Sequence, residues 1–575
     1  MTLDKDLTAA AVVALTSGEH GDFRGFDAVW ASLANLTDPA LVAWKLSLHA
    51  VRWSFDPTAV ATPDPADALH IAKSLPPDAA QALARACSVI ERAYIAALDR
   101  AALERWLEVH ETLPPQGGEA EAVNMVSLST ARLWKKVLAG EAASEAAHAK
   151  DMFESASRLR AAGQVIESTV LRSLLALSAG EVDPAVEWAR RASRMAQAES
   201  LPQLEYLANL TLARVRRYSG RPHLALHILG ALSRVAPPIW SGWIAWEVTL
   251  AGGDPIGQRF SATAPLAQAP AMLAARELGV FLRQVREDPT GPEKQSVAAT
   301  FAAHAQALRE RASCWADLSQ ETETLTAALD VRQEAAPSAL EPWRRGQTTA
   351  IPYGLHAIGI PRGQNLEAET ATAFVVARPN AEGRRMLRPG LALNADARVL
   401  TREAAKNAAA GVRTETGIAA LALAGPSGLS REDFFRTVYG FSFVPLRHQA
   451  VLDVLCHRMR HLLGDAGELR RDGGDGANAG IGASSGPSLA LILRETIVVP
   501  DMRCALPTAD RVLRALATLG TTSASVAAES LRMPLRTVQA ILQQLVAEGS
   551  CTVEREGRRV NYRIEDTTFT EVTAA

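Results

Sequence analysis

Between residues 507 and 566 the spacing of apolar residues changes from helical to strand-like, which restricts this segment to a small α+β fold. Over 534–545 the apolar residues follow the i, i+3, i+4, i+7 spacing of a helix with one buried face: Val538, Ile541, Leu542 and Leu545. Over 552–564 polar and apolar residues alternate instead, which is typical of a β-hairpin. Two further helices are predicted upstream, one over 508–519 and one that ends at 530–533.

Basic and amide side chains gather on the outer face of the third predicted helix and at the tip of the predicted hairpin. Helical spacing places five short, polar or basic residues opposite the apolar stripe: Arg536, Thr537, Gln539, Ala540 and Gln543. Such a face suits a helix that enters the major groove of DNA. At the hairpin turn, Gly557 is followed by Arg558 and Arg559, which would contact phosphates or the minor groove. The pattern favours binding of double-stranded DNA.

The segment 503–566 resembles the winged helix-turn-helix domains of bacterial regulators, including the ArsR-like group. The resemblance lies in a short helix, the recognition helix and the wing: Ala528–Leu531, Thr537–Val538, the pair Leu542 and Leu545, and residues 555–562. It implies that the third helix recognises DNA. The chain departs from the family at Arg532, because a left-handed turn residue there is usually glycine. Dimerisation or docking, which some winged helices mediate, is the alternative for this module.

A second amphipathic pattern precedes this module. Ser430 to Asp433 has the spacing of a helix N-cap, and a long helix is predicted over 446–463, ending at Gly464. Its buried stripe would consist of Leu452, Leu455, Met459 and Leu462. The opposite side carries polar residues: Arg447, Gln449, Asp453, His457 and Arg460.

This second region resembles the OmpR/PhoB-type effector domain of response regulators. The resemblance follows the order Ser430–Asp433, Val438–Phe441 and His448–Gly464. In that family the long helix carries an Arg-Leu-Arg-x-x-Leu signature and recognises DNA; the matching residues here are Arg458, Met459, Arg460 and Leu463. The resemblance implies DNA contacts from the polar side of the helix: Arg447, Gln449, His457 and Arg460. The wing departs from the family, because a Gly/Ala/Ser-rich run to Pro487 precedes the predicted return strand at 489–493.

The first 334 residues are rich in alanine and leucine and predict successive helices. Residues 177–185 and 218–225 form an internal repeat in which Ala185 and Ala225 lie forty residues apart. Each unit is expected to be a helical hairpin that stacks on its neighbours, and the repeat resembles tetratricopeptide-like repeats. Further helices of the same superhelix are predicted at 26–36, 41–55, 79–98, 103–113, 271–286 and 296–311. A non-repeating helical domain would have the same composition and is the alternative.

These patterns predict a mainly α protein, an α-solenoid followed by two α+β winged-helix domains. The boundaries are a helical-repeat domain at 1–334, a proline-rich linker and small β-layer at 335–383, an OmpR/PhoB-like domain at 384–500, a winged helix-turn-helix at 503–566 and a tail at 567–575. The sheet of the OmpR/PhoB-like domain is expected within 386–400.

Composition fits a cytoplasmic multidomain protein. The chain has 575 residues, of which 48 % are hydrophobic, and a formal net charge of −3. With this charge, DNA binding has to come from local basic patches rather than from bulk electrostatics. Five cysteines without a CxxC pair indicate a reducing compartment, and no apolar stretch approaches the roughly 18 residues of a membrane span.

Motifs for catalysis and cofactor binding are weak. The sequence contains no GxxxxGK[ST] phosphate-binding loop, and the glycine-rich run 473–486 does not end in a lysine. His457 and His461 have a metal-ligand spacing beside Cys456, but no third ligand stands at motif spacing. We therefore expect a non-enzymatic protein without a metal or cofactor.

Two functions remain open from the sequence. One is a sequence-specific DNA-binding transcriptional regulator whose helical repeats hold a protein, peptide or small-molecule partner. The other is a non-catalytic assembly scaffold in which repeats and winged helices both contact proteins. Winged helices usually bind half-sites as dimers, so the chain either forms a homodimer or covers a composite site with its two modules.

Overall fold

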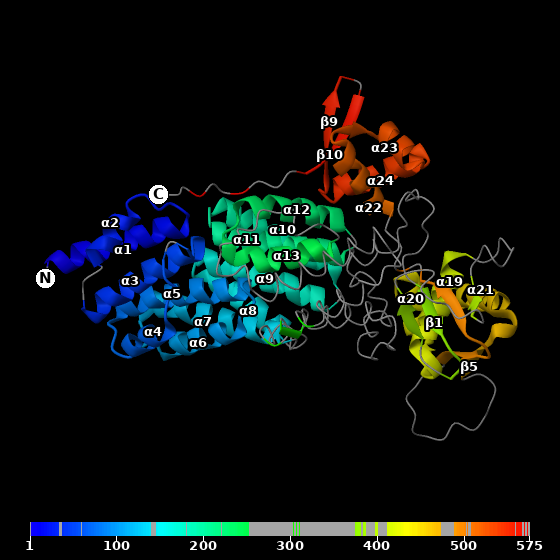
Figure 1. The fold of residues 1–575 in the computed structure, drawn as a ribbon, viewed down its shortest axis with the longest axis horizontal. Helices are drawn as coiled ribbons and strands as arrows, with labels where there is room; N and C mark the ends of the chain where they lie inside the picture. The colour runs from blue at the N-terminus through cyan, green and yellow to red at the C-terminus, as the bar shows by residue number, and fades with distance from the viewer. Residues whose placement is uncertain are drawn as a thin grey trace. The chain divides into compact units, whose positions relative to one another are not determined.

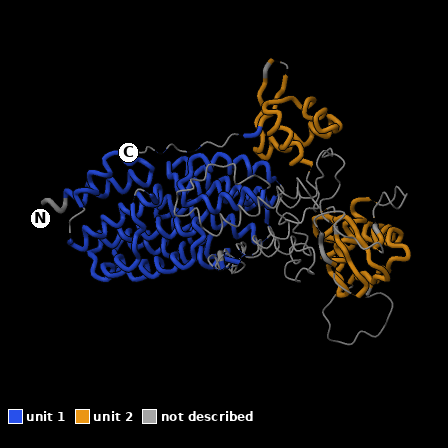
Figure 2. Tube along the Cα trace, in the orientation of Figure 1, with its two compact units in different colours: residues 1–279, 300–319, 564–575 blue, residues 280–299, 320–563 orange. Residues whose placement is uncertain are grey.

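The computed structural model describes residues 2–251, except at 34–36, 59, 140–144, 180 and 220, and residues 374–380, 383–386, 397–400, 411–472, 488–501 and 508–565, except at 558, with seven isolated residues besides (303, 306, 307, 310, 503, 569 and 572). This part of the chain is mainly helical and has small sheets in its C-terminal region. It divides into two compact units (Figure 2): residues 1–279, 300–319 and 564–575 form the first unit, and residues 280–299 and 320–563 form the second.

Helices form the first unit, and several begin where an aspartate caps the backbone. The Asp38 carboxylate accepts from the amides of Ala40 and Leu41, and Asp64 and Asp99 cap two later helices. The helices are α1 (Thr2–Glu19), α2 (Phe26–Leu33), α3 (Pro39–Phe55), α4 (Pro65–Ala72), α5 (Pro77–Ala96), α6 (Arg100–Thr112), α7 (Gly118–Leu138), α8 (Ala146–Arg158), α9 (Ala162–Ser178), α10 (Val182–Ala198), α11 (Pro202–Tyr218), α12 (Pro222–Val235) and α13 (Ser241–Leu250) (Figure 1).

The odd-numbered helices of the first unit form a row. Helices α3, α5, α7, α9 and α11 pack successively on one another. Helices α6, α8 and α10 each pack on the two odd-numbered helices beside them in the sequence. The row therefore brings together residues that lie far apart in the sequence.

The internal repeat coincides with two helical hairpins, α9–α10 and α11–α12. Ala185 and Ala225, at equivalent positions in the second helix of each hairpin, are fully buried. The Ser173 hydroxyl of α9 donates to the Ala185 carbonyl at 2.7 Å, and Val215 of α11 packs on Ala185 from the other side. A larger residue than alanine at 185 would separate these helices. The two repeats also share a glycine before the second helix, at Gly180 and Gly220, and both of these glycines lie outside the described residues.

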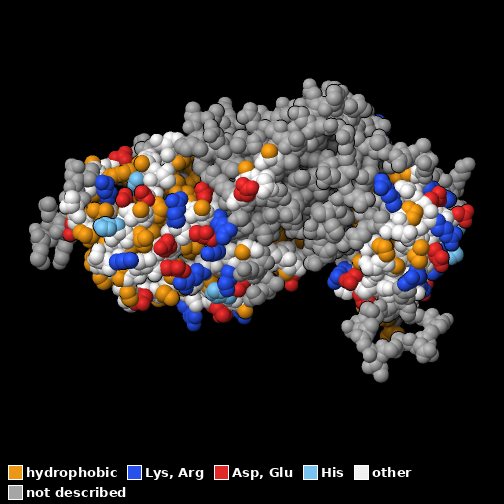
Figure 3. All heavy atoms as spheres, turned by 60° about the horizontal axis from the view of Figure 1, so that its bottom comes forward, with side chains coloured by type: hydrophobic (Ala, Val, Ile, Leu, Met, Phe, Trp, Pro, Cys, Tyr) orange, Lys and Arg blue, Asp and Glu red, His pale blue; other side chains and the backbone are white. Residues whose placement is uncertain are grey.

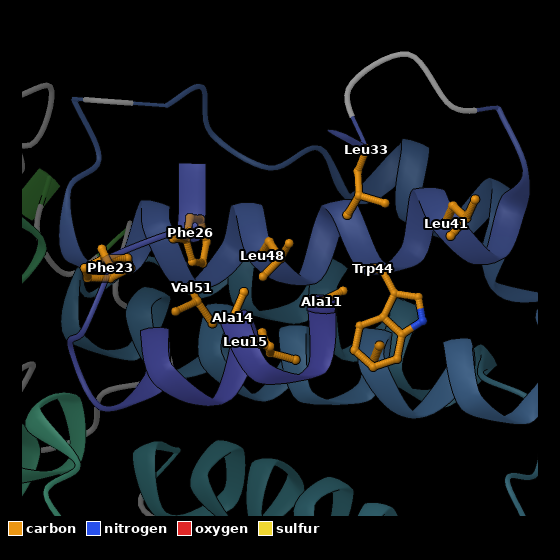
Figure 4. Close-up of a cluster of buried hydrophobic side chains, with 11 residues drawn as sticks. Ala11, Ala14, Leu15, Phe23, Phe26, Leu33, Leu41, Trp44, Leu48 and Val51 are labelled. Atoms are coloured by element: carbon orange, nitrogen blue, oxygen red, sulfur yellow. The ribbon is translucent and has the colours of Figure 1, made fainter. Parts of the chain in front are cut away.

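The N-terminal helices share an apolar core (Figure 4). Leu15 of α1, Phe23 and Phe26 before and at the start of α2, and Trp44 and Leu48 of α3 are all buried there. Phe23 and Phe26 meet edge to face with ring centroids 5.3 Å apart. Residues 7–15, which are mostly apolar in the sequence, therefore belong to a helix that packs into the first unit.

The second unit begins with two sheets packed on helix α19 (Val412–Ala424). A four-stranded sheet has the order β2 (Arg384–Met386), β1 (Phe374–Ala377), β7 (Ile497–Pro500), β3 (Arg398–Val399), and a three-stranded sheet has the order β4 (Leu429–Ser430), β6 (Ser488–Leu493), β5 (Gly467–Asp472). Helices α20 (Arg431–Tyr439) and α21 (Pro445–Leu463) pack on α19. The four-stranded sheet thus includes a strand at 374–377, ahead of residue 384, at which the sequence placed the start of this domain, and ahead of the range 386–400 in which its sheet was expected.

The C-terminal module, defined as residues 508–564, contains three helices and three strands. They are α22 (Thr508–Leu519), β8 (Thr522–Ser523), α23 (Ala524–Leu531), α24 (Leu535–Ala547), β9 (Cys551–Glu556) and β10 (Arg559–Ile564). The sheet order is β8-β10-β9, so the two longer strands form a hairpin and β8 pairs antiparallel with β10. These elements coincide with the three helices and the hairpin expected from the sequence.

Some expectations fall where the structure gives no description. The helix expected at 271–286, most of 296–311, the linker at 335–373, the Gly/Ala/Ser-rich run at 473–487 and most of the tail lie outside the described residues. Among the described helices, none combines the length and the low polarity that crossing a membrane requires.

Candidate nucleic-acid interface

Helix α24 has two distinct faces. Val538, Leu542 and Leu545 are fully buried, and the helix packs on α22, α23 and β9. Ile541, the fourth residue of the predicted stripe, is half-buried. The apolar spacing therefore fixes which side of the helix faces solvent.

The solvent face of α24 carries the five residues that the sequence singled out, all exposed: Arg536, Thr537, Gln539, Ala540 and Gln543. The neighbouring Gln544 differs from Gln539 and Gln543, because its amide donates to the Glu548 carboxylate at 2.7 Å. Gln539 and Gln543 lie one turn apart on this face, and Ala540 lies beside them. The face is therefore rich in amide donors and acceptors and carries one basic group.

A tight turn positions α24 after α23. Arg532 ends α23 with φ 47° and ψ 41°, the left-handed conformation expected at this position, and Pro534 provides the N-cap. The Met533 amide donates to the Ala528 carbonyl at 2.9 Å, which closes the turn. An arginine adopts here a backbone conformation that glycine tolerates at lower cost.

The β9–β10 hairpin projects a basic tip. Gly557 occupies the turn with φ +64°, and Arg559 begins β10 in an exposed position. Arg558 lies outside the described residues. Arg555, exposed near the end of β9, adds a basic group that our sequence-based site did not include. Its position beside the turn in a predicted hairpin was the signal that could have found it.

Helix α21 shows the stripe predicted for the first module. Leu452, Leu455, Met459 and Leu462 are buried, and Cys456 is buried with them. Three of the predicted contact residues are exposed: Arg447, His457 and Arg460. Arg458, from the family signature, is exposed beside them.

Gln449 is half-buried and engaged, in contrast to the other predicted contacts on α21. Its amide donates to the Asp453 carboxylate at 3.1 Å, and Arg471 of β5 pairs with the same carboxylate at 2.5 Å. The hydrogen bond from Arg471 is the main cause that lowers the pKa of Asp453. Gln449 is therefore held within the protein, beside a carboxylate whose charge Arg471 balances.

Apolar side chains also stand exposed on α21. Leu446, Val451 and Val454 are exposed, and Val451 and Val454 line a groove with Val412 and Tyr439. Such residues do not suit a phosphate-contacting surface, and they distinguish α21 from α24.

Charges of both signs are mixed on the face of the molecule that Figure 3 presents, in agreement with the small net charge. Within the described residues, no three His, Cys, Asp or Glu side chains are grouped to hold a metal ion. Comparisons with protein-family models, curated proteins and solved structures found no match.

Proposed function

We propose that this protein is a sequence-specific DNA-binding transcriptional regulator whose C-terminal module is a winged helix-turn-helix. One observation carries the proposal: α24 buries its apolar stripe and exposes an amide-rich and basic face, beside a hairpin with an arginine at its tip. A helix with amide and basic side chains on its exposed face can enter the major groove, and the hairpin would lie along the backbone or the minor groove. Neither feature needs a strongly basic protein.

The proposal assigns base recognition to Gln539 and Gln543. The amide nitrogen of a glutamine can donate to N7 of adenine while its amide oxygen accepts from the N6 amino group. This pair of hydrogen bonds is specific for adenine. Gln539→Ala should weaken binding to the preferred site by about 1–3 kcal/mol and relax specificity at one position. Gln544→Ala is the matched control, because this amide is paired with Glu548 and should leave DNA affinity unchanged.

The experiment uses the full chain. Duplexes are selected from a random-sequence library, and affinity for the selected and the unselected pool is measured over a salt series. A regulator prefers the selected duplexes, and Gln539→Ala reduces that preference. Equal losses on both pools would show that Gln539 does not recognise a base, and absence of any duplex binding would overturn the proposal.

The hairpin is assigned a different role. Arg559 should neutralise about one phosphate, so Arg559→Ala should weaken binding to all duplexes and reduce the salt slope by about one unit. Arg24→Ala, which removes an exposed arginine of the first unit, should leave the slope unchanged.

The first module supports a second function, protein contact. The exposed Leu446, Val451 and Val454 on α21 favour a protein partner at this helix, whereas Arg447, His457 and Arg460 favour DNA. Leu446→Ser would separate the two functions: loss of self-association at unchanged DNA affinity assigns this side of α21 to a homodimer. Loss of DNA affinity at an unchanged oligomeric state assigns it to DNA.

The first unit is proposed to be a tetratricopeptide-like solenoid that acts as the sensor. The successive packing of α5, α7, α9 and α11 and the equivalent hairpins α9–α10 and α11–α12 support this assignment. In stacked helical repeats the surface formed by one helix of each pair is where partners bind.

A further inference from the structure

The odd-numbered helices of the first unit line a cavity of about 330 Å³ that is partly open to solvent. Its lining comes from α1, α3, α5, α7, α9 and α11 and from the loop before α7, so residues from 19 to 204 contribute to one space. The volume lies at the lower end of the range of small-molecule pockets, which begins at roughly 300 Å³. The cavity is therefore large enough for a small ligand.

Gln116 lines this cavity with an unpartnered amide. The residue is only 9 % exposed, and neither its amide nitrogen nor its amide oxygen has a hydrogen-bond partner within the described residues. Burying an amide without partners is unfavourable, so such groups in native proteins are usually matched by something that binds them. The unpartnered amide of Gln116 offers two N–H donors and a carbonyl acceptor side by side.

Two further donors line the same cavity. Arg92 donates from its terminal nitrogen to Glu167 at 2.9 Å, while its buried Nε has no partner among the described residues. The Asn124 carbonyl oxygen is held by His110 at 2.8 Å, which leaves the amide nitrogen of Asn124 as its free donor. The Arg92 Nε and the Asn124 amide nitrogen could each donate a hydrogen bond to an acceptor atom of a ligand.

The charges around the cavity are compensated within the protein. Arg85 pairs with Glu19, and Arg92 pairs with Glu167. Gln203 is also fixed, because its amide donates to the Ser54 carbonyl at 2.9 Å and accepts from the Trp240 indole at 2.9 Å. A charged ligand would find no uncompensated opposite charge among these groups. Val51, Phe55, Val89 and Leu204 supply apolar walls.

We propose that this cavity binds a small uncharged compound that carries an amide group. The ligand's carbonyl accepts from the Gln116 amide nitrogen, its N–H donates to the Gln116 oxygen, and an apolar group lies on the apolar walls. Binding rests on the cavity alone. The role of this ligand as the effector rests on the proposed regulatory function.

N-acetyl-leucinamide is a suitable probe, because it has two amides and one apolar side chain and no charge. Its binding to the full chain is measured by ligand-observed NMR and by the shift of the thermal transition of the first unit. N-acetyl-leucine, which carries a carboxylate in place of the terminal amide, serves as the charged comparison. We expect the amide to bind at least tenfold more tightly than the acid.

Gln116→Leu removes the amide while keeping the volume of the side chain. This variant should bind the probe at least tenfold more weakly and should raise the midpoint of thermal unfolding without ligand, because a buried unmatched polar group is lost. Gln197→Leu, at an exposed position on α10 outside the cavity, should retain wild-type binding.

The proposal fails if the wild-type chain does not bind N-acetyl-leucinamide, or if Gln116→Leu binds it as well as the wild type does. Both measurements are made without DNA. Failure of the cavity proposal is therefore distinct from failure of DNA binding, which the duplex selection tests separately.

Discussion

Helices α11 and α24 place their polar residues in opposite ways. Most of α11 is buried around its whole circumference, and its buried residues include Arg214, Arg217 and Asn209. Helix α24 buries one stripe and exposes its arginine and its three glutamines to solvent. Buried polar groups have to be satisfied by the protein or a ligand, whereas exposed ones are free for a large partner. This difference underlies our two proposals, in which buried polar groups of the first unit bind a small ligand and the exposed ones of α24 contact DNA.

The largest effect is expected at Glu247 of α13. Its carboxylate is 1 % exposed and accepts from Arg214 at 2.5 Å and from Arg217 at 2.8 Å, both of them equally buried. Glu247→Gln removes the negative charge that both buried guanidinium groups contact, and so weakens two buried ion pairs at once. We expect a loss of about 3–5 kcal/mol in the free energy of opening of α11, measured by amide hydrogen exchange in the full chain.

An exposed ion pair provides the control for this prediction. Glu111 pairs with Arg132 at 2.9 Å, and both side chains are about half exposed. Glu111→Gln should change the free energy of opening by less than about 1 kcal/mol. If Glu247→Gln costs no more than this control, the buried charges of α11 are not stabilised by their pairing and the comparison with α24 loses its basis.

The second effect concerns the apolar face of α24. Leu542→Ala should destabilise α24 by about 2–5 kcal/mol, because Leu542 is fully buried and its removal leaves a cavity. Gln543→Ala, the next residue, should change stability by less than about 0.5 kcal/mol because its side chain is exposed. Hydrogen exchange of α24 measures both variants. Similar losses from the two substitutions would mean that α24 is buried on both faces, as α11 is.

This contrast also explains what the sequence could predict. The helices of the C-terminal module, the buried stripe at Val538, Leu542 and Leu545, and the exposed face beginning at Arg536 followed from spacing alone, because one face of α24 is apolar and the other is polar. The same spacing found the buried stripe of α21. It also found the hairpins α9–α10 and α11–α12, because small residues recur at fixed intervals there.

The remainder depends on tertiary contacts that spacing does not encode. Helical spacing places Asp453 one turn after Gln449, but the Arg471 side chain that pairs with Asp453 comes from a strand that begins after the helix has ended. The cavity at Gln116 is formed by six helices, so no local pattern marks it. Strand β1 belongs to the four-stranded sheet because it pairs with β7, which lies more than one hundred residues later in the sequence.

A smaller effect is expected from His110 of α6. Burial lowers the pKa of His110, but the Glu91 carboxylate at 3.0 Å and the hydrogen bond to Asn124 outweigh this, so that the pKa is raised above its ordinary value. Arg132 of α7 opposes the rise. Since the folded state holds the proton more tightly than the unfolded state, this stabilisation is complete below about pH 6.5 and is lost as pH rises through the folded-state pKa.

The pH dependence can be measured by the protection of α6 amides, referenced at each pH to their intrinsic exchange rate, between about pH 6 and pH 9. Protection should fall with rising pH in the wild type. The fall should be absent in His110→Gln and present in His70→Gln, which replaces an exposed histidine on α4. Protection that increases with pH would show that His110 is held neutral, and the Glu91–His110–Asn124 network would then have to be reassigned.

The smallest effect concerns the backbone rather than side-chain placement. Arg532 and Gly440 both end a helix in the left-handed conformation, with φ 47° and φ 81°. A non-glycine residue in this conformation costs about 1–2 kcal/mol of stability. Replacing it with glycine removes that strain, but part of the stabilisation is lost because glycine has more conformational freedom in the unfolded chain. Arg532→Gly should therefore stabilise α23 by roughly 0.5 kcal/mol. Gly440→Ala should destabilise α20 through its backbone conformation alone, because the new Cβ would meet no atom within 4 Å. Both are measured by hydrogen exchange of the helix that the residue ends. If Arg532→Gly destabilises α23 instead, the arginine side chain makes contacts that outweigh the backbone strain. Arg532 would then contribute to stability although it is exposed, as the buried arginines of α11 do.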